Sequence, residues 1–328
     1  MKRFKQLLSF LLVAAMVLSL STAVFAIDAS ELTDIDQNSA VGKAVTRLVS
    51  NGIIDGYEDK TYRPDNTITR AEFSKVIATF LGLGDIGTET LATGFSDVDG
   101  PNHWSKKYVK LAVDKGIVLG YPDGTFGPDK PVTYAEAVKM IVCALNYGQT
   151  AEERQIPGAA WYTGYIAQAG ELGVLDGVSV NSQEDPASRG TVALLINNAL
   201  DADVANVTKT STGTIVTSSS GKTAQETYQG SKEITGVVTK CEQTSITDGT
   251  TTGKLRVITI LSGNKEKTYK VKESVDPYSF LGYNVKAYVD NDYSGEYDYL
   301  KSIQKSNRNV VTTVKAADID TVTDNSVS

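Results

Sequence analysis

The fold is decided by residues 95–148, which read FSDVDGPNHWSKKYVKLAVDKGIVLGYPDGTFGPDKPVTYAEAVKMIVCALNYG. Apolar residues recur at helical spacing near both ends of this stretch, and glycine, proline and aspartate fill its middle. This pattern predicts two helices joined by a long loop rich in turns. Residues 32–84 follow the same plan 64 positions earlier, with Gly56 at the place of Gly120. A third, more divergent copy covers residues 156–200.

The copies also share the signals that begin and end helices. Thr69 with Glu72, and Thr133 with Glu136, have the spacing of a capping box at the start of the second helix. Asn51-Gly52 is typical of a left-handed helix end. A helix pair of this length cannot bury its own apolar faces, so the three copies must pack on one another. The sequence therefore predicts a multidomain chain that opens with an all-α domain of helix–loop–helix repeats.

Three motifs in these copies are shared with a known family. They are FSDV at 95–98 followed by Trp104, GYPDGTFGP at 120–128, and ITRAE at 68–72. Together they resemble the S-layer homology (SLH) domain. The resemblance implies a three-fold pseudo-symmetric trimer of repeats on a secreted bacterial protein. It also implies non-covalent anchoring to the cell wall, by binding pyruvylated secondary cell-wall polysaccharide attached to peptidoglycan in grooves between the repeats.

The N-terminus predicts secretion. Lys2, Arg3 and Lys5 precede an apolar run at 7–20, and Val-Phe-Ala at 24–26 suits signal peptidase. The alternative is a membrane anchor, but the run is short for a span. The expected domains are a signal peptide at 1–26, SLH repeats at 27–84, 85–148 and (degenerate) 149–204, a Ser/Thr-rich linker at 205–232, and a β-rich module at 233–328, with continuation beyond residue 328 left open.

The net charge limits the classes of binding partner, and the cysteine content limits the disulfides. The formal charge is −7, and removal of the three basic residues of the signal peptide, which holds no acidic residue, makes it −10. Such an acidic chain argues against nucleic acid or a membrane surface as partner. The two cysteines are too few for a disulfide framework. Cys143 reads as a core thiol, while the state of Cys241 stays open.

An acidic sugar requires a cation, hydrogen-bonding groups and an apolar platform. Arginine binds a carboxylate through two parallel hydrogen bonds, and Arg70 follows a helix N-cap, where the helix dipole also favours an anion. Arg70 could instead be a surface residue or pair with an aspartate of a neighbouring repeat. Asp34 and Asp97 could accept sugar hydroxyls or simply cap a segment. Trp104 and Trp161 could be platforms, packing residues or both.

The copies differ at these positions, and the differences rank the grooves. The resemblance implies a ligand site made of Arg70, Asp97, Trp104, Arg189, Asp34, Trp161, Gly56 and Gly120. Our hypothesis is that each groove takes its arginine from one repeat and its aspartate and tryptophan from the next. The expected grooves are a complete one of Arg70, Asp97 and Trp104, a partial one of Arg189 and Asp34, where Ala40 replaces tryptophan, and an inactive one where Tyr134 faces Trp161.

From residue 233 the apolar residues alternate, as at 234–239, 255–260, 269–271, 285–289 and 310–314. This pattern predicts a small antiparallel all-β domain, with an open sheet and a barrel both allowed. Residues 290–296 have EF-hand-like spacing, but Lys301 stands where calcium loops need a glutamate, which favours a hairpin turn. No metal or cofactor is expected.

The module contains no histidine, and Cys241 has no neighbouring base to activate it. We therefore expect a non-catalytic anchor rather than an enzyme. Two alternatives stay open. One is a lattice-forming structural protein that self-associates in a surface layer. The other is a wall-localised enzyme whose activity lies in the β module or in further C-terminal sequence.

Overall fold

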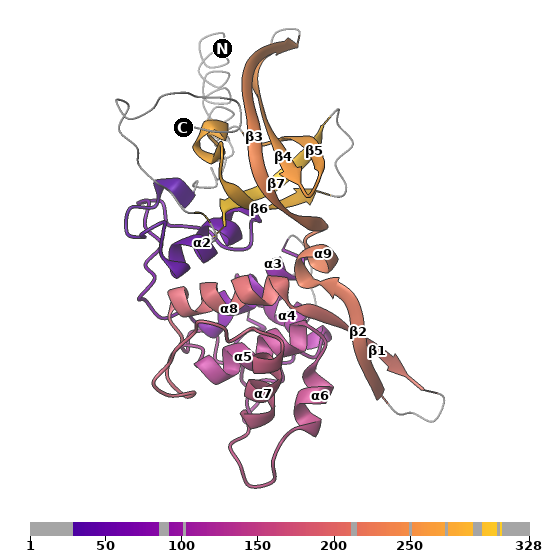
Figure 1. Ribbon diagram of the computed structural model, residues 1–328. Coiled ribbons are helices and arrows are strands. Elements are labelled where there is room, and N and C mark those ends of the chain that lie inside the picture. Colours follow the sequence, from indigo (N-terminus) through magenta and orange to yellow (C-terminus); the bar gives the residue numbers. More distant parts are fainter. Residues whose placement is uncertain are drawn as a thin grey trace, which may run out of the picture.

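The computed structural model describes residues 29–84, 92–100, 103–210, 215–248, 251–272, 275–290, 297–306 and 309. A helical part comes first in the chain and a strand-rich part follows it (Figure 1). The helices are η1 (Ala29–Glu31), α2 (Ala40–Ser50), α3 (Arg70–Phe80), α4 (Lys106–Asp114), α5 (Tyr134–Ala144), α6 (Gly148–Glu153), α7 (Thr163–Glu171), α8 (Arg189–Asp201), α9 (Ala224–Tyr228) and η2 (Pro277–Phe280). The strands are β1 (Asp203–Lys209), β2 (Ile215–Thr223), β3 (Ser231–Asp248), β4 (Thr251–Ser262), β5 (Lys265–Lys270), β6 (Asn284–Asp290) and β7 (Asp298–Lys305).

Both predicted capping boxes are confirmed. Thr69 Oγ1 accepts a hydrogen bond from the Glu72 N–H at 3.2 Å, and Glu72 Oε2 accepts one from the Thr69 N–H at 2.9 Å. Thr133 and Glu136 repeat this arrangement at the start of α5. The predicted left-handed end is also present, since Gly52 has a φ of 69° after α2. Local signals thus fix where these helices begin and end.

The three repeats contact one another in a closed cycle. The first helix of each repeat packs on the second helix of another, in the pairs α2 with α8, α4 with α3, and α7 with α5. At the centre, the Ile68 N–H donates to Ala187 O, the Ala187 N–H to Val132 O, and the Val132 N–H to Ile68 O. The distances are 3.2, 2.9 and 3.0 Å. Because each segment donates to one neighbour and accepts from the other, the backbone joins the repeats without a gap in the ring.

One apolar core runs through the helical part. Its fully buried side chains come from all three repeats and include Leu48, Phe73, Val138, Ile141 and Leu195. A buried side chain of this size contributes about 1.5–3 kcal/mol by leaving water. A helix pair taken alone would leave much of this surface exposed, which is the physical reason that the repeats occur together.

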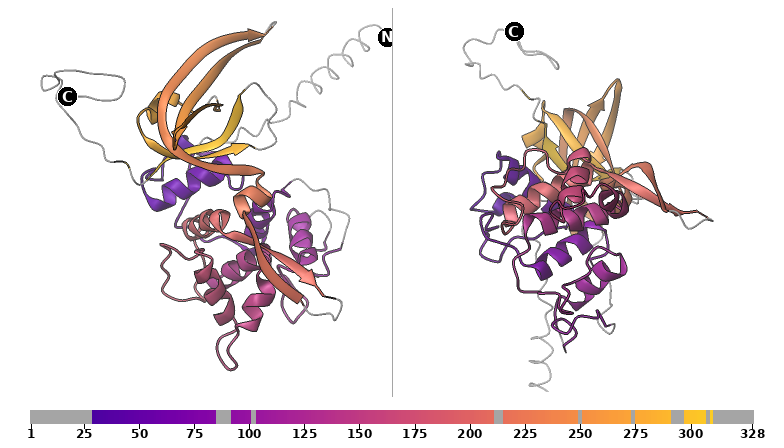
Figure 2. Two further views of the ribbon diagram at one scale, coloured as in Figure 1. Left: turned by 45° about the vertical axis from the view of Figure 1, so that its right-hand side comes forward. Right: turned by 90° about the horizontal axis from the view of Figure 1, so that it is seen from below.

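The segment predicted as a Ser/Thr-rich linker at 205–232 contains two strands and a short helix among its described residues, so these are more than a simple connection. β1 and β2 pair as an antiparallel hairpin that projects from the helical part (Figures 1 and 2). The short helix α9 then packs on the helical core, with Ala224 fully buried. The Tyr228 hydroxyl donates to Ala144 O at 2.7 Å. Composition was misleading because most described residues of this hairpin are exposed, and many of them are Ser, Thr or Lys.

The predicted β module forms a closed barrel with the strand order β3-β4-β5-β7-β6. Its interior is filled by apolar side chains such as Val238, Ile258, Ile260 and Ala287. The prediction of a wholly antiparallel domain is wrong for one pair, since β5 and β7 run parallel. An odd number of strands cannot alternate in direction around a closed barrel, so one parallel pair is required. This order, with its parallel third and fifth strands, is that of an OB-type barrel.

Several predictions lie outside the described residues. They are the signal peptide at 1–26, the strand at 310–314 and most of the acidic loop at 290–296. Among the described residues, no helix has both the length and the apolar character needed to cross a membrane. Cys143 and Cys241 are both free thiols. Burial raises the pKa of each thiol to about 11, so both are protonated near neutral pH.

Candidate functional site

The second helix of each repeat begins where two repeats meet. Arg70, Tyr134 and Arg189 are the first residues of α3, α5 and α8. Their backbone N–H groups donate to loop carbonyls of another repeat, at Lys130, Asp185 and Asn66, over 2.8–2.9 Å. The side chain at this position is therefore aimed at the loop of another repeat by the ring of backbone contacts.

Arg70 is buried in such a junction, with 6% of its surface exposed. Its Nε donates to Phe126 O at 2.9 Å, and its guanidinium lies 4.8 Å from the centre of the Tyr121 ring. Nη1 forms an ion pair with Glu136 Oε1 at 2.8 Å. One alternative from the sequence was that Arg70 pairs with an aspartate of a neighbouring repeat. Arg70 does pair with a carboxylate of the next repeat, but that carboxylate belongs to Glu136. This pair neutralises the charge that an anionic ligand would use.

Arg189 makes the equivalent contacts with the first repeat, except for the ion pair. Its Nε donates to Tyr62 O at 2.8 Å, and its guanidinium lies 4.8 Å from the centre of the Tyr57 ring. Nη2 donates to Asp55 O at 3.3 Å. Within the described residues, Arg189 forms no ion pair and its Nη1 makes no hydrogen bond. The positive charge of this half-buried side chain is thus held in place by carbonyls and aromatic faces but is not neutralised.

Asp34 and Asp97 act on the backbone of their own repeats. Asp97 accepts hydrogen bonds from the N–H groups of Phe126 and Gly127, at 2.9 and 2.8 Å. Asp34 accepts from Tyr62 and Arg63, both at 2.7 Å. Each carboxylate therefore fixes the loop whose carbonyl receives the arginine Nε. The capping interpretation of these two residues is the one that the geometry favours.

Two pockets open beside the arginines, and each draws on all three repeats. The Arg189 pocket has a volume of about 290 Å³. Its residues from the first repeat include Gly56, Tyr57, Glu72 and Lys75, and the second repeat supplies Trp104. The Arg70 pocket, of about 460 Å³, combines Arg70 with Gly120, Glu136 and Lys139 of the second repeat and Trp161 of the third.

These linings correct the predicted grouping. Trp104 lies in the pocket of Arg189 rather than that of Arg70, and Trp161 takes the corresponding place beside Arg70. The hypothesis placed the tryptophan in the repeat that follows the arginine, and this is wrong. In each pocket the repeat that follows the arginine supplies the loop, and the remaining repeat supplies the tryptophan. Tyr134, predicted to face Trp161 in an inactive groove, is 3% exposed and does not line the pocket that contains Trp161.

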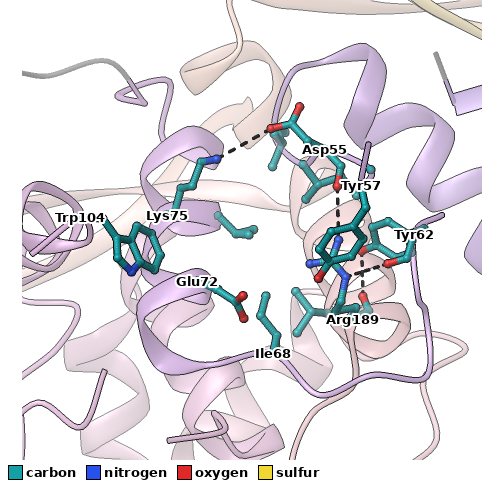
Figure 3. A pocket seen from close by; sticks show the side chains of 13 residues that line it. Asp55, Tyr57, Tyr62, Ile68, Glu72, Lys75, Trp104 and Arg189 are labelled. Carbon is teal, nitrogen blue, oxygen red and sulfur yellow. Dashed lines mark hydrogen bonds and ion pairs between the residues drawn. The ribbon is translucent and has the colours of Figure 1, made fainter. Parts of the chain in front are cut away.

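The Arg189 pocket presents polar groups and an aromatic face to solvent (Figure 3). Trp104 is 53% exposed, and the Glu72 carboxylate points into the space between Trp104 and Arg189. Lys75 lies 3.8 Å from Asp55 at the rim. Burial raises the pKa of Tyr62 to about 12, so its hydroxyl stays protonated and donates to Arg189 O at 3.0 Å. The pocket can therefore offer a cation, a hydroxyl acceptor and a ring surface to one ligand.

The Arg70 pocket is more apolar. It includes Val118 and Met140, and Leu119 at its edge is 75% exposed. Trp161 is 47% exposed, with the Lys139 ammonium 5.7 Å from its ring centre. Lys139 is therefore the cation of this pocket that stands apart from the Arg70–Glu136 pair.

Gly56 and Gly120, both predicted as site residues, differ in how strongly their positions require glycine. Gly120 has a φ of 72°, and a Cβ there would come within 2.2 Å of the Phe95 ring. Gly56 has ordinary backbone geometry, and a Cβ there would meet the flexible Leu32 side chain at 2.6 Å. Gly120 is thus required by the turn itself.

Sequence reasoning missed the tyrosines and lysines of these pockets. Tyr57 and Tyr121 stack on the arginines, and Lys75 and Lys139 stand at matching positions of α3 and α5. Their recurrence at the 64-residue spacing was the available signal. Among the described residues, no cluster of histidine, cysteine or carboxylate side chains is suited to a metal ion.

Copies of one helix–loop–helix unit, joined by backbone hydrogen bonds and with pockets between them, define a repeat protein. Residues 31–74 and 95–138 match the family model of the S-layer homology domain, and the chain carries this domain in its first two repeats. It is a secreted, cell-wall-attached protein of the bacterial surface. The third repeat lies outside the matched residues.

Proteins with similar sequences are named as cell-wall, surface-layer or anchoring proteins. The chain is 29% identical over 310 residues to the middle cell wall protein of Brevibacillus brevis, covering 88% of the chain and 28% of the relative. It is 29% identical to the surface layer protein of Brevibacillus choshinensis, over 89% of the chain and 26% of the relative. A cellulosome-anchoring protein of Acetivibrio thermocellus is 38% identical over 35% of the chain and 26% of its own length. The chain thus spans about a quarter of the length of these relatives.

Proposed function

We propose that this chain anchors a secreted protein to the bacterial cell wall by binding an acidic, pyruvylated wall polysaccharide. The observation that carries the proposal is the Arg189 pocket, where an arginine without an ion-pair partner among the described residues faces the exposed ring of Trp104. An anchoring role is also named for the Acetivibrio relative, which is a cellulosome-anchoring protein. The chain takes no part in catalysis in this proposal.

The recognition chemistry follows from the pocket. The guanidinium binds the sugar carboxylate through Nη1, which makes no hydrogen bond within the described residues, and through the second N–H of Nη2. Its Nε donates to Tyr62 O, and the other Nη2 N–H donates to Asp55 O. Trp104 stacks on the apolar face of the sugar ring. Glu72 Oε1, which has no hydrogen-bond partner within the described residues, accepts a sugar hydroxyl, while Oε2 remains in the capping box.

The ring of backbone hydrogen bonds among Ile68, Val132 and Ala187 supports a three-fold pseudo-symmetric trimer, with the third repeat at 149–204 as a full member. This arrangement matters because both pockets depend on all three repeats. A single repeat would present its arginine without the loop that orients it and without the tryptophan that faces it.

The experiment that tests this function is co-sedimentation of the protein with purified cell wall. Native wall is compared with wall from which the pyruvylated polymer has been extracted. We expect the protein to pellet with native wall and to remain in solution with extracted wall. Equal pelleting with both would overturn the proposal.

Assembly into a surface layer is a second candidate, favoured by the name of the Brevibacillus choshinensis relative. It concerns the whole protein, of which this chain covers a fraction. Electron microscopy of the purified chain after removal of denaturant tests it. Ordered sheets would support self-association, and their absence would leave wall binding as the function of this part.

A further inference from the structure

The short helix α9 lies where the helical part of the chain meets the strand-rich part (Figure 1). The last carbonyls of a helix have no partner within that helix, and they carry a partial negative charge. α9 and the residue after it donate hydrogen bonds to such carbonyls at the ends of α3, α5 and α8. These are the second helices of the three repeats, so one short element joins the same end of three equivalent helices.

The first two repeats receive side-chain donors. Gln229 Nε2 donates to Thr79 O and Phe80 O, the last two carbonyls of α3, at 3.1 and 2.7 Å. The Tyr228 hydroxyl donates to Ala144 O, the last carbonyl of α5. Burial raises the pKa of Tyr228 to about 12, so this hydroxyl stays protonated at neutral pH and remains a donor. The Tyr228 ring also packs edge-on against Phe80, with the ring centres 5.7 Å apart.

The third repeat receives a backbone donor. The Ala224 N–H, at the start of α9, donates at 2.9 Å to Ala202 O, directly after α8. Ala224 is fully buried, and Gln225 is 1% exposed. Gln225 Oε1 accepts a hydrogen bond from Arg47 Nη2 of α2 at 3.1 Å. The start of α9 is therefore inserted into the helical part rather than laid over its surface.

A glycine after α3 makes room for α9. Gly82 has a φ of 71°, and a Cβ there would lie 2.4 Å from Tyr228 O. Gly52 follows α2 in the same conformation, with a φ of 69°, but a Cβ there would meet nothing within 4 Å. The left-handed turn alone explains Gly52, whereas Gly82 is also required by the close approach of the α9 backbone.

α9 is tied to the barrel as well. β3 begins at Ser231, whose Oγ accepts a hydrogen bond from Gln225 Nε2 at 2.6 Å. Lys301 of β7 donates to Gln229 O. Gln229 thus holds the barrel through its carbonyl and α3 through its side chain. Contacts from the barrel therefore reach the ends of the repeat helices through α9.

We propose that α9 is a latch that keeps the ring of repeats closed and couples the barrel to the repeat junctions. The latch holds the C-terminal ends of α3 and α8, and Arg70 and Arg189 stand at the opposite ends of the same two helices. Helices of 11 and 13 residues are rods of about 16–20 Å. A displacement at the latch is therefore transmitted to the pockets. Ring closure does not depend on a ligand, and only the effect on the pockets rests on the proposed function.

Amide hydrogen exchange of the full chain tests the latch, with Gly82→Ala as the variant and Gly52→Ala as its matched control. Both changes place a Cβ at the same positive φ, but only Gly82→Ala forces the backbone of α9 to move. We expect Gly82→Ala to speed exchange of the Ala224 amide and of the three amides of the central ring. The increase should be at least about tenfold larger than in the control. Faster exchange at Ala224 with the ring amides unchanged, or equal exchange in the two variants, would overturn the proposal.

A second pair of variants decides the matter if Gly82→Ala unfolds the whole chain. The Val238 amide of the barrel, which donates to Tyr283 O, reports global unfolding. Tyr228→Phe removes only the hydroxyl donor to the end of α5, and Tyr147→Phe removes a hydroxyl that donates to Asp203 instead. We expect faster exchange of the ring amides in Tyr228→Phe than in Tyr147→Phe. The same exchange in both would contradict the latch.

Co-sedimentation with native cell wall tests the coupling to the pockets. We expect Gly52→Ala to pellet like the unaltered protein and Gly82→Ala to pellet less, because the residues of each pocket come from different repeats. Full pelleting of Gly82→Ala would overturn the coupling. Failure of the unaltered protein to pellet would contradict the proposed function instead, and the exchange measurements, which use no ligand, would still decide whether α9 is a latch.

Discussion

Arg70 Nη1 lies 2.8 Å from Glu136 Oε1, and the two side chains are 7% and 19% exposed. Arg189 occupies the equivalent position of the third repeat, yet it forms no ion pair among the described residues. The capping glutamate of the first repeat, Glu72, lines its pocket instead. One junction has therefore become a structural ion pair, while the other keeps an arginine available for an anion.

Replacement of the two capping glutamates should separate these roles. Glu136→Gln removes the partner of a buried arginine, and we expect a loss of about 3 kcal/mol in the free energy of unfolding. Glu72→Gln keeps a side-chain oxygen that can accept from the Thr69 N–H, so it should cost only about 0.5 kcal/mol or less. Urea unfolding of both variants measures the difference. Equal losses would show that the Arg70–Glu136 pair contributes no more than the cap.

The loop aspartates should prove structural. Asp97→Ala leaves two backbone N–H groups without their carboxylate, and we expect a loss of about 2 kcal/mol. Asp34→Ala should cost less, because Asp34 is exposed and water can replace it. Asp114→Asn is the control, since its pair with Lys110 is an exposed one on α4 worth about 0.5 kcal/mol or less. A cost for Asp97→Ala no greater than that of the control would contradict the role given to this residue.

Substitution of Gly120 should be destabilising both because its φ is positive and because a Cβ would meet the Phe95 ring, and a comparison with Gly124 separates the two effects. Gly120→Ala and Gly124→Ala both place a side chain at positive φ, at 72° and 80°, which costs about 1–2 kcal/mol. Only at Gly120 would the new Cβ meet the Phe95 ring. We expect Gly120→Ala to lower the melting temperature clearly more than Gly124→Ala. Equal effects would mean that the Phe95 ring can move away without cost.

Sequence reasoning succeeded where the signal was local. The capping boxes at Thr69 and Thr133 and the glycine turns depend on residues a few positions apart, so spacing alone reveals them. Sequence reasoning did not predict correctly which tryptophan lies in the same pocket as which arginine. That pairing depends on how the repeats are rotated within the ring, and nothing near Arg70 in the sequence records that Trp161 lies beside it.

The prediction for residues 205–232 missed their strands and helix for a different reason. Its contacts with the helical part come from few side chains, such as Ala224, Gln225 and Tyr228, within a polar stretch. Gln225 donates to Asn51 Oδ1 at 2.8 Å and to Ser231 Oγ at 2.6 Å. Polar contacts of this kind leave no apolar periodicity, so composition alone indicated a linker.

Asp201 should make the joint between the two parts sensitive to acid. Burial raises the pKa of this carboxyl, but the charges of Arg47 and Lys286 outweigh burial and hold it below its ordinary value of 3.8. A lowered folded-state pKa contributes stability that is fully present above the unfolded-state pKa and is lost as pH falls through the folded-state pKa. The loss should therefore begin below about pH 4.

Asp201→Asn checks this dependence. At neutral pH we expect a loss of about 2 kcal/mol, less than for a fully buried pair because the Asp201 side chain is 41% exposed. The difference should start to shrink below about pH 4 and disappear only below the folded-state pKa, where Asp201 is protonated in both folded and unfolded chains. Glu171→Gln, which removes an exposed pair with Arg154, is the control. A difference that persists undiminished at low pH would contradict the electrostatic role.

The most direct measurement is calorimetric titration of purified wall polysaccharide into matched arginine variants. Arg189→Gln should weaken binding at least about tenfold, because the unpaired cation of the Trp104 pocket is lost. Arg70→Gln, compared at a temperature where circular dichroism shows it folded, should retain most of the affinity, since its charge is held by Glu136. If Arg189→Gln binds like the unaltered protein and Arg70→Gln does not, the assignment of the anion to the Arg189 pocket is wrong.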